Sequence, residues 1–123
     1  MTDKKAVAVI GASSDKSKAS NQAVERLLEK GYKVYPINPK LKTLHGQKVY
    51  PDLKALPEPI HTLSVYLGEK RSTPLLNDIL TLNPHRILLN PGAENPFLTK
   101  EAKSQNIHVE EACTLVLLGI GTF

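Results

Sequence analysis

Near its amino terminus the chain carries a short apolar segment that ends at a glycine, Val7-Ala8-Val9-Ile10-Gly11-Ala12-Ser13. An uninterrupted apolar segment of this length is typical of a strand that is buried on both faces of a parallel sheet. A glycine at the end of such a strand allows the backbone to turn and a ligand to approach closely. The segment therefore predicts the first strand of an α/β domain, followed by a loop that can bind a ligand.

Strand-like and helix-like patterns alternate along the rest of the chain. With the first one included, five short apolar segments are predicted to be strands, at residues 5–10, 32–37, 62–67, 86–89 and 107–111. Helical spacing and capping signals predict helices at residues 19–30, 73–82, 95–105 and 114–118, and one helical turn at 52–56. The alternation predicts one domain over residues 1–123 with a Rossmann-like, doubly wound α/β fold. In this fold about five mostly parallel strands carry helices on both faces.

Capping residues mark the expected ends of the helices. Ser20 or Asn21 is predicted to cap the first helix, and Gly31 is predicted to end it. A polar residue followed by proline predicts an N-cap and a first helical position in two places, Thr73-Pro74 and Asn95-Pro96. These boundaries set the expected lengths of the loops that follow the strands.

The composition is that of an ordinary globular chain. Of its 123 residues, 41% are hydrophobic and 23% are charged, which argues against disorder. The apolar segments are far shorter than the ~20 residues of a membrane span and shorter than the apolar region of a signal peptide. The one cysteine cannot form an internal disulfide. A cytoplasmic protein without membrane association is therefore expected.

Positive charge is concentrated in the first part of the chain. Residues 1–48 carry ten Lys and Arg against four acids, whereas residues 49–123 carry six against eight. This asymmetry indicates either a solvated basic face or an anion site in the first half. The basic residues are scattered and aromatic residues make up only 5% of the chain, so no nucleic-acid partner is expected.

The loop after the first strand has the composition of a phosphate site. Ser13 and Ser14 offer hydroxyl donors, and Lys18 offers positive charge. The loop leads into a helix N-terminus, where unpaired N–H groups attract anions. It matches neither the Gly-x-Gly-x-x-Gly dinucleotide motif nor the Walker A motif. We interpret it as a phosphate-binding loop, with a solvated polar connection as the alternative.

The second strand is followed by Asn38-Pro39-Lys40. In nicotinamide-dependent enzymes an acidic residue near this place binds the ribose hydroxyls. Here the nearest charge is Lys40, which favours a ribose that carries a phosphate. The alternative is an ordinary surface lysine.

Two later segments follow the fourth and fifth strands. Pro91-Gly92 forms a turn in which glycine permits a close approach, and Glu94 beside it is either a general base or a capping or solvated residue. Cys113 is either a small buried hydrophobic residue or, at the start of the last helix, a reactive thiolate. The four histidines show no metal-ligand spacing, so no metal site is predicted.

Four of these segments carry a family resemblance: Val7-Ala8-Val9-Ile10-Gly11-Ala12-Ser13, Asn38-Pro39-Lys40, Gly46-Gln47-Lys48-Val49-Tyr50 and Cys113. In order and spacing they resemble the small stand-alone CoA-binding proteins, which are similar to the N-terminal domain of the succinyl-CoA synthetase α subunit. The resemblance covers nearly the whole chain. It implies a Rossmann-like fold with CoA lying across the carboxyl ends of the strands.

The resemblance also implies roles for individual residues. The loop residues Gly11, Ala12, Ser13 and Ser14 would contact the phosphates of CoA. Lys40, after Asn38 and Pro39, would contact the phosphorylated ribose. The remaining ligand-binding residues would line the ligand or lie near its thiol, and they are Tyr66, Leu67, Pro91, Gly92 and Cys113.

Three positions depart from the family pattern. Leu67 stands where the synthetase domain has proline, and Ala112 stands where many stand-alone members have arginine. Pro91 stands where the synthetase has glutamate, which argues against a transferred catalytic role. The synthetase reaction also needs a phosphohistidine-bearing second domain and a partner subunit, which this chain is expected to lack.

Three functions remain open from the sequence. The first is a protein that binds CoA or an acyl-CoA and has no complete catalytic apparatus of its own. The second is an NAD(P)-linked oxidoreductase or a redox-sensing nucleotide-binding protein, which would need an acidic ribose partner or an activated Cys113. The third is a non-catalytic interaction subunit, because the apolar tail of residues 115–123 is suited either to cover the sheet edge or to form a homodimer contact.

Overall fold

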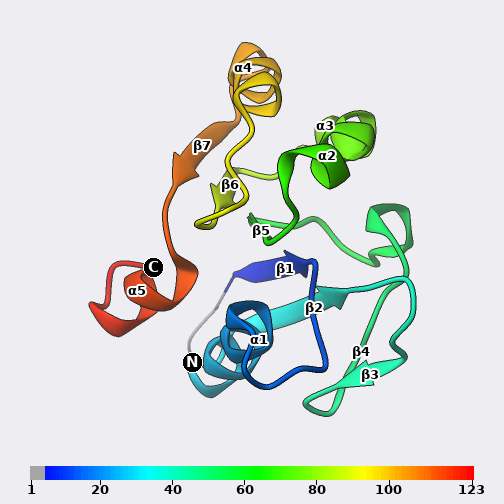
Figure 1. Cartoon of the computed structure of the whole chain (residues 1–123), viewed down its shortest axis with the longest axis vertical. Coiled ribbons are helices and arrows are strands. Elements are labelled where there is room, and N and C mark those ends of the chain that lie inside the picture. Colours follow the sequence, from blue (N-terminus) through cyan, green and yellow to red (C-terminus); the bar gives the residue numbers. More distant parts are fainter. Residues whose placement is uncertain (1–4) are drawn as a thin grey trace.

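The computed structural model describes residues 5–123, which fold around five parallel strands in the order β2-β1-β5-β6-β7 (Figure 1). The strands are β1 (Ala6–Ile10), β2 (Lys33–Ile37), β5 (Thr62–Val65), β6 (Arg86–Leu89) and β7 (His108–Glu111). The predicted Rossmann-like, doubly wound sheet is confirmed. The prediction of one domain covers residues 1–123, and its first four residues lie outside the described residues.

Helices cover both faces of this sheet. α1 (Ala19–Glu29) and α5 (Thr114–Gly119) lie on one side, and α2 (Glu69–Ser72), α3 (Leu76–Leu82) and α4 (Pro96–Ser104) lie on the other (Figure 1). A 3-10 turn, Thr73–Leu75, joins α2 to α3. Within residues 5–123, no helix has both the length and the apolar character that a membrane crossing requires.

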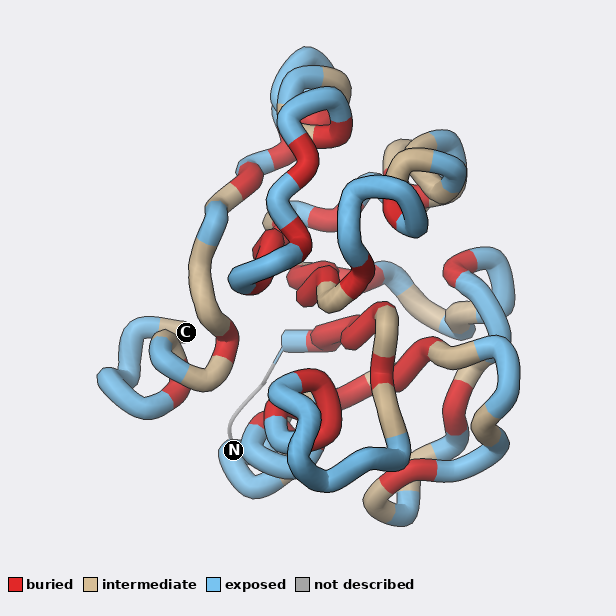
Figure 2. The backbone as a smooth tube through the Cα atoms, viewed as in Figure 1, coloured by how far each residue is buried: buried red, intermediate tan, exposed pale blue. Residues whose placement is uncertain are grey.

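Two hydrophobic cores form because successive residues of a strand point to opposite faces of the sheet. Ala8 of β1 belongs to one core with Leu98 of α4, and Val9 belongs to the other with Leu27 of α1. Figure 2 shows the buried residues concentrated in the strands, with exposed residues on the outer helices and loops. Burial of one such aliphatic side chain contributes about 1.5–3 kcal/mol, so the two cores hold the sheet edge on which the site is built.

A short antiparallel hairpin after β2 is not predicted by the sequence patterns. Its strands, β3 (Thr43–Leu44) and β4 (Gln47–Lys48), have two residues each, too few for apolar alternation to show. After the hairpin, Tyr50 N donates to Pro36 O at 2.9 Å, which returns the chain to the end of β2. The predicted helical turn follows as the 3-10 turn Leu53–Ala55.

The first turn of α1 differs from the prediction. Lys18 occupies the N-cap position, and no side chain caps the helix. Ser20 and Asn21, the predicted caps, lie inside the helix and are buried. The predicted cap is wrong because the Asn21 amide instead donates from Nδ2 to Ser13 O at 2.8 Å. Gly31 has a φ of +88°, which confirms it as the stop.

The helical segment after β5 begins earlier than predicted. Gly68 is the N-cap of α2, and Thr73 already has helical φ and ψ of −56° and −45°. Thr73-Pro74 is therefore wrong as a helix start, and it forms a 3-10 turn within a longer helical segment. The matching prediction at Asn95-Pro96 is confirmed, because the Asn95 side chain caps α4. The earlier start matters for function because it places Arg71 at the sheet edge.

Candidate functional site

The carboxyl ends of β1, β2 and β5 lie together at one edge of the sheet. From β1 the chain passes to β2 on one side, and it then crosses back to β5 on the other side of β1. Such a reversal of strand order opens a crevice at the carboxyl edge, where α/β proteins bind ligands. The loops after these three strands and the N-terminus of α1 border this crevice.

Gly11 allows the ends of β1 and β5 to come into contact. Its φ is +88°, a left-handed conformation that costs other residues roughly 1–2 kcal/mol. A Cβ at this position would lie 3.1 Å from Leu67 Cδ2 and 3.2 Å from the carbonyl carbon of Tyr66. Conformation and space therefore both require glycine at this position.

The loop between β1 and α1 is held by its own hydrogen bonds. Asp15 N donates to Ser13 Oγ at 3.0 Å, and Ser17 donates from N and Oγ to Asp15 Oδ1 at 2.9 and 2.7 Å. The bonds from Ser17 lower the pKa of Asp15. Asn21 donates to Ser13 O, and its Oδ1 lies 2.9 Å from His45 Nε2. A loop ordered in this way loses little entropy when it binds a ligand.

A cavity of about 430 Å³, the basic cavity, lies between this loop and the starts of α1 and α2. Its lining comprises Gly11, Ala12, Ser13, Lys18, Ala19, Ser20, Asn38, Tyr66 and Arg71. Lys18 and Arg71 supply positive charge. The first N–H groups of α1 have no partner within the helix. This combination fits an anionic group with several oxygens, such as a phosphate.

A second cavity of about 210 Å³, the apolar cavity, adjoins the first. Gly11, Asn38 and Arg71 line both cavities, which makes them two chambers of one groove. Most of the remaining wall is apolar and consists of Ile10, Ile37, Pro39, Pro51, Leu53, Leu67 and Leu75. Asp52 and Asp78 add two carboxylates to the lining. The groove thus offers an apolar chamber beside a basic one.

Asn38 joins the loops that separate the two chambers. Its Nδ2 donates to Ala12 O at 2.7 Å, and its Oδ1 accepts from Lys40 N at 2.7 Å. These bonds hold the loop after β2 against the loop after β1. They also fix the backbone of Lys40 beside Pro39, which lines the apolar cavity. The Lys40 side chain is exposed and lines neither cavity.

The groove brings together many of the residues that the sequence singles out. Those lining one or both chambers are Gly11, Ala12, Ser13, Lys18, Asn38, Pro39, Tyr66 and Leu67. Those lining neither chamber are Ser14, Lys40, Pro91, Gly92 and Cys113. Sequence reasoning missed Asp52, Leu53, Arg71, Leu75 and Asp78. Recognising the helix start at Gly68 would have indicated Arg71 as a site residue, because a helix that begins there places Arg71 just after the end of β5.

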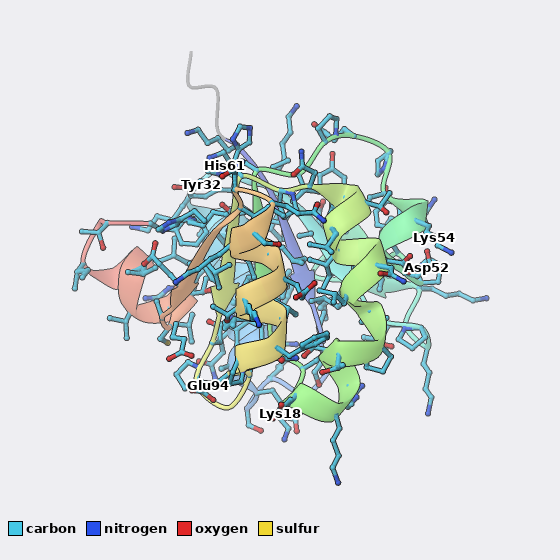
Figure 3. All side chains as sticks on the ribbon, turned by 90° about the horizontal axis from the view of Figure 1, so that it is seen from above. Lys18, Tyr32, Asp52, Lys54, His61 and Glu94 are labelled. Carbon is cyan, nitrogen blue, oxygen red and sulfur yellow. The ribbon has the colours of Figure 1, made fainter. Side chains whose placement is uncertain are left out.

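The candidate residues after β6 lie at the same end of the molecule as the basic cavity. Figure 3 shows Glu94 at the end where Lys18 lies. Glu94 is exposed and its Oε1 accepts a hydrogen bond from Gly92 N at 3.0 Å, whereas Asn95 is the residue that caps α4. Cys113 is half-buried and occupies the N-cap position of α5.

A buried polar network connects this end of β6 to its neighbours. Asn90 Nδ2 donates to Ser64 Oγ and to Val65 O, both at 2.9 Å, and Asn90 Oδ1 accepts from Thr114 N at 2.8 Å. Ser64 Oγ lies 2.8 Å from Thr114 Oγ1. All four residues are fully buried. The network fixes the start of α5 to the carboxyl edge of β5 and β6.

Comparison with known proteins assigns the chain to a family. Residues 5–119 match the family model of the CoA binding domain. The chain belongs to the CoA-binding domain family. Because the match covers nearly all of the described residues, it confirms the resemblance to CoA-binding proteins seen in the sequence.

Solved structures share the fold of this CoA-binding domain. An uncharacterised protein is 29% identical, with a TM-score of 0.92 over 99% of this chain and 100% of that chain. A protein from Thermus thermophilus is 31% identical, with a TM-score of 0.88 over 98% of this chain and 91% of that chain. A dinucleotide-forming acetyl-coenzyme A synthetase from Ca. Korarchaeum cryptofilum, in complex with phosphate and ADP, is 28% identical. Its TM-score is 0.76, over 88% of this chain and 25% of that chain.

Tyr66 of this CoA-binding domain lines the basic cavity and buries its hydroxyl. The hydroxyl has no hydrogen-bond partner among the described residues. The Ser64 and Thr114 hydroxyls lie near enough to favour its ionised form, but neither meets hydrogen-bond geometry. Burial outweighs them and raises the pKa of Tyr66 to about 12. Tyr66 therefore stays protonated at neutral pH.

Tyr66→Phe is expected to leave the free energy of unfolding unchanged or to raise it by up to about 1 kcal/mol, because a buried donor without a partner is removed. Tyr35→Phe is the matched control. The Tyr35 hydroxyl donates to Glu58 Oε2, so its loss is expected to lower the free energy of unfolding by about 1 kcal/mol. Urea unfolding measures both variants. An equal loss in the two would contradict the unpaired state of the Tyr66 hydroxyl.

Proposed function

We propose that the protein binds CoA or an acyl-CoA in the groove formed by the basic and apolar cavities. The observation that carries this proposal is the pair of adjoining chambers of opposite character that share Gly11, Asn38 and Arg71. CoA also has two unlike parts side by side, because a ribose joins its flat adenine ring to a charged pyrophosphate. Membership of the CoA-binding domain family supports the same ligand class.

The basic cavity fits the pyrophosphate. Lys18 and Arg71 complement the charge of the phosphate oxygens, and the N–H groups at the start of α1 can donate to them. The Ser13 hydroxyl accepts from Asp15 N, so its own proton remains available for a phosphate oxygen. The cavity therefore supplies both charge and hydrogen-bond donors.

The apolar cavity fits the adenine ring. Its carboxylates can accept a hydrogen bond from the exocyclic amino group of adenine. Asp52 Oδ1 already accepts from Ala55 N at 3.0 Å, and Asp78 Oδ1 lies 3.8 Å from Lys54 Nζ. The second oxygen of each carboxylate remains as an acceptor.

The ribose 3′-phosphate distinguishes CoA from NAD, and we assign its recognition to Lys40. The backbone of Lys40 is held beside Pro39, a wall of the apolar cavity. From this position its exposed side chain has the length to reach a ribose at that chamber. A lysine here favours a phosphorylated ribose over the bare diol of NAD.

The pantetheine arm is assigned a path past Tyr66 toward Pro91, Gly92 and Cys113, at the carboxyl ends of β6 and β7. Glu94, the acid next to that turn, is engaged by Gly92 N. This engagement supports a protein that binds its ligand without a complete catalytic apparatus of its own.

Calorimetric titration with CoA, dephospho-CoA and NAD tests the ligand. CoA is expected to bind roughly 10-fold or more tightly than dephospho-CoA, because one charge-assisted contact to a phosphate contributes about 1.5–3 kcal/mol. Lys40→Ala is expected to remove this difference while leaving dephospho-CoA binding unchanged. Binding of NAD alone, or of none of the three, would contradict the proposal.

Arg71→Gln tests the groove itself. Because Arg71 lines both chambers, its loss is expected to weaken CoA and dephospho-CoA alike by roughly 10- to 100-fold. Lys103→Gln removes an exposed charge from the last turn of α4. As the control, it is expected to leave both affinities within about 2-fold. An unchanged CoA affinity in Arg71→Gln would place the ligand elsewhere on the protein.

A further inference from the structure

The amino-terminal edge of the sheet, opposite the groove, gathers basic residues. Each of the five strands begins with a basic residue or directly follows one, namely Lys5, Lys33, His61, His85 and His108. Because the strands are parallel, these residues meet at one edge. Figure 3 shows His61 and Tyr32 at the end of the molecule opposite Lys18 and Glu94. The CoA-binding groove accounts for none of these basic residues.

Two cavities lie at this edge and share Lys5 and His61 as a common wall. The first has a volume of about 190 Å³ and is also lined by Tyr32, Arg86 and Phe123. The second has a volume of about 230 Å³ and is also lined by Lys33, Glu58 and His85. No residue that lines the groove lines either of them.

The charges around the common wall do not balance. Lys33 Nζ lies 3.9 Å from Glu58 Oε1, so this pair is close to neutral. Arg86 Nη2 lies 3.4 Å from Phe123 O, and neither Lys5 nor Arg86 forms an ion pair with an Asp or Glu side chain of residues 5–123. Within residues 5–123, two permanent positive charges therefore stand beside the imidazole of His61 without a paired Asp or Glu side chain. A dianion matches them in charge.

Buried Thr62 couples Arg86 to His61. Arg86 Nε donates to Thr62 Oγ1 at 3.3 Å, and His61 Nδ1 lies 2.8 Å from the same oxygen. The buried Thr62 hydroxyl is satisfied when it donates a hydrogen bond to His61 Nδ1. The neutral imidazole then carries its proton on Nε2. Arg86 Nη2 donates to Phe123 O at 3.4 Å. The guanidinium has five N–H groups, so others remain to donate to a ligand. The first cavity thus carries hydrogen-bond donors from Lys5, His61 and Arg86.

We propose that this edge is a second ligand site, which binds a small molecule carrying a dianionic phosphate group between Lys5, His61 and Arg86. A phosphate supplies the acceptors and the negative charge that these donors lack. The cavity beside Arg86 also contains the edge-to-face pair of Tyr32 and Phe123, whose ring centroids are 5.2 Å apart. This aromatic lining favours an organic phosphate ester with a flat ring over inorganic phosphate.

The titration of His61 gives a direct readout of the site. Burial lowers the pKa of His61, and the charges of Lys5, His85 and Arg86 lower it further. A bound dianion stabilises the imidazolium, so it is expected to raise this pKa. The phosphate itself gains a second proton at about pH 6, so the expected signature is the raised pKa of His61 and not tighter binding at low pH. The other titratable groups at this edge are Tyr32, Lys33, Glu58, His108 and Glu110.

The imidazole NMR signals of the four histidines separate this site from the groove in one spectrum. Inorganic phosphate and adenosine 5′-monophosphate are added in turn, with sodium chloride of equal ionic strength as the reference. The His61 and His85 signals are expected to shift saturably, and the pKa of His61 to rise by about half a unit or more. His45 contacts Asn21 beside the phosphate loop and reports the groove. His108 pairs with Glu110 at 3.0 Å and lines neither cavity, so its signal reports whether the change extends along the edge beyond the two cavities.

The two phosphates distinguish the source of the ligand group. Tighter binding of the nucleoside monophosphate supports an organic ester, and tighter binding of inorganic phosphate supports the free ion. The site proposal is overturned when neither phosphate moves His61 and His85 more than chloride does. A failure of CoA to bind the groove leaves this result unaffected, because the two sites share no lining residue.

Two variants test the residues assigned to the phosphate. Lys5→Gln, at an exposed position, is expected to weaken the phosphate response of His61 by roughly 10-fold or more. Arg86→Gln is expected to do the same, with its fold checked by circular dichroism because the guanidinium packs 4.6 Å from the Phe123 ring centroid. Lys103→Gln is the matched control and is expected to respond as the wild type does. A wild-type response in both Lys5→Gln and Arg86→Gln would overturn the site.

Discussion

Gly11→Ala is expected to weaken CoA binding by roughly 30-fold or more and to lower the free energy of unfolding by roughly 2–4 kcal/mol. Alanine at a φ of +88° is strained. Its Cβ would also lie 3.2 Å from the carbonyl carbon of Tyr66, which separates the ends of β1 and β5 by a few tenths of an ångström. The separation reaches the ligand, because Gly11 lines both cavities and its contacts Tyr66 and Leu67 line one each.

Gly46→Ala is the matched control for this prediction. Gly46 has a φ of +77°, and a Cβ there would meet no atom within 4 Å. Gly46→Ala therefore introduces the backbone strain, about 1–2 kcal/mol, without a steric contact of the new Cβ. The CoA affinity of this variant is expected to stay at the wild-type value. Urea unfolding and calorimetric titration, done where circular dichroism shows both variants folded, measure the difference. Equal losses of stability with unchanged CoA binding in both would refute the role of Gly11 in the groove.

The sheet could be predicted from the sequence, whereas some helix starts could not. β1 and β6 are buried on both faces, so each is visible as an apolar segment. The start of α1 depends on Asn21, whose amide bonds the backbone of Ser13 eight residues earlier instead of the helix end. The partner of Asn21 depends on the path of the loop between β1 and α1. A capping rule considers only neighbouring residues, so it cannot predict this bond. The two-residue strands β3 and β4 are too short for any periodicity.

Part of the candidate site could also be predicted, because a loop directly after the first strand must lie at the carboxyl edge. Leu53 could not, since it reaches the groove from a segment that only folding brings there, and sequence reasoning misses Arg71 because it does not recognise the helix start at Gly68. Three of the four Asn-Pro pairs look alike in sequence and act differently in the structure. Asn38 joins two loops, Asn95 caps α4, and Asn90 centres a buried network. Side-chain identity alone does not separate these roles.

Asn90→Ala is expected to lower the free energy of unfolding by roughly 3–5 kcal/mol. Three hydrogen bonds are lost, and the fully buried N–H of Thr114 is left without its acceptor. Val65 O keeps one donor, because Asn90 N also donates to it at 3.2 Å. The penalty therefore falls mainly on the start of α5. Urea unfolding measures the total, and faster amide exchange at Thr114 is expected to report the local loss.

The direction of the hydrogen bonds in this network gives a sharper test. Because Asn90 Nδ2 donates to Ser64 Oγ, the buried Ser64 proton is satisfied by Thr114 Oγ1. Ser64→Ala then breaks one bond that Asn90→Ala also breaks, so the double variant is expected to lose about 1 kcal/mol less than the sum of the single losses. Ser72 is an equally buried serine that accepts from Asn95 and shares no partner with Asn90. Ser72→Ala combined with Asn90→Ala is therefore expected to be additive, and additivity in both pairs would show that Asn90 and Ser64 do not act as one network.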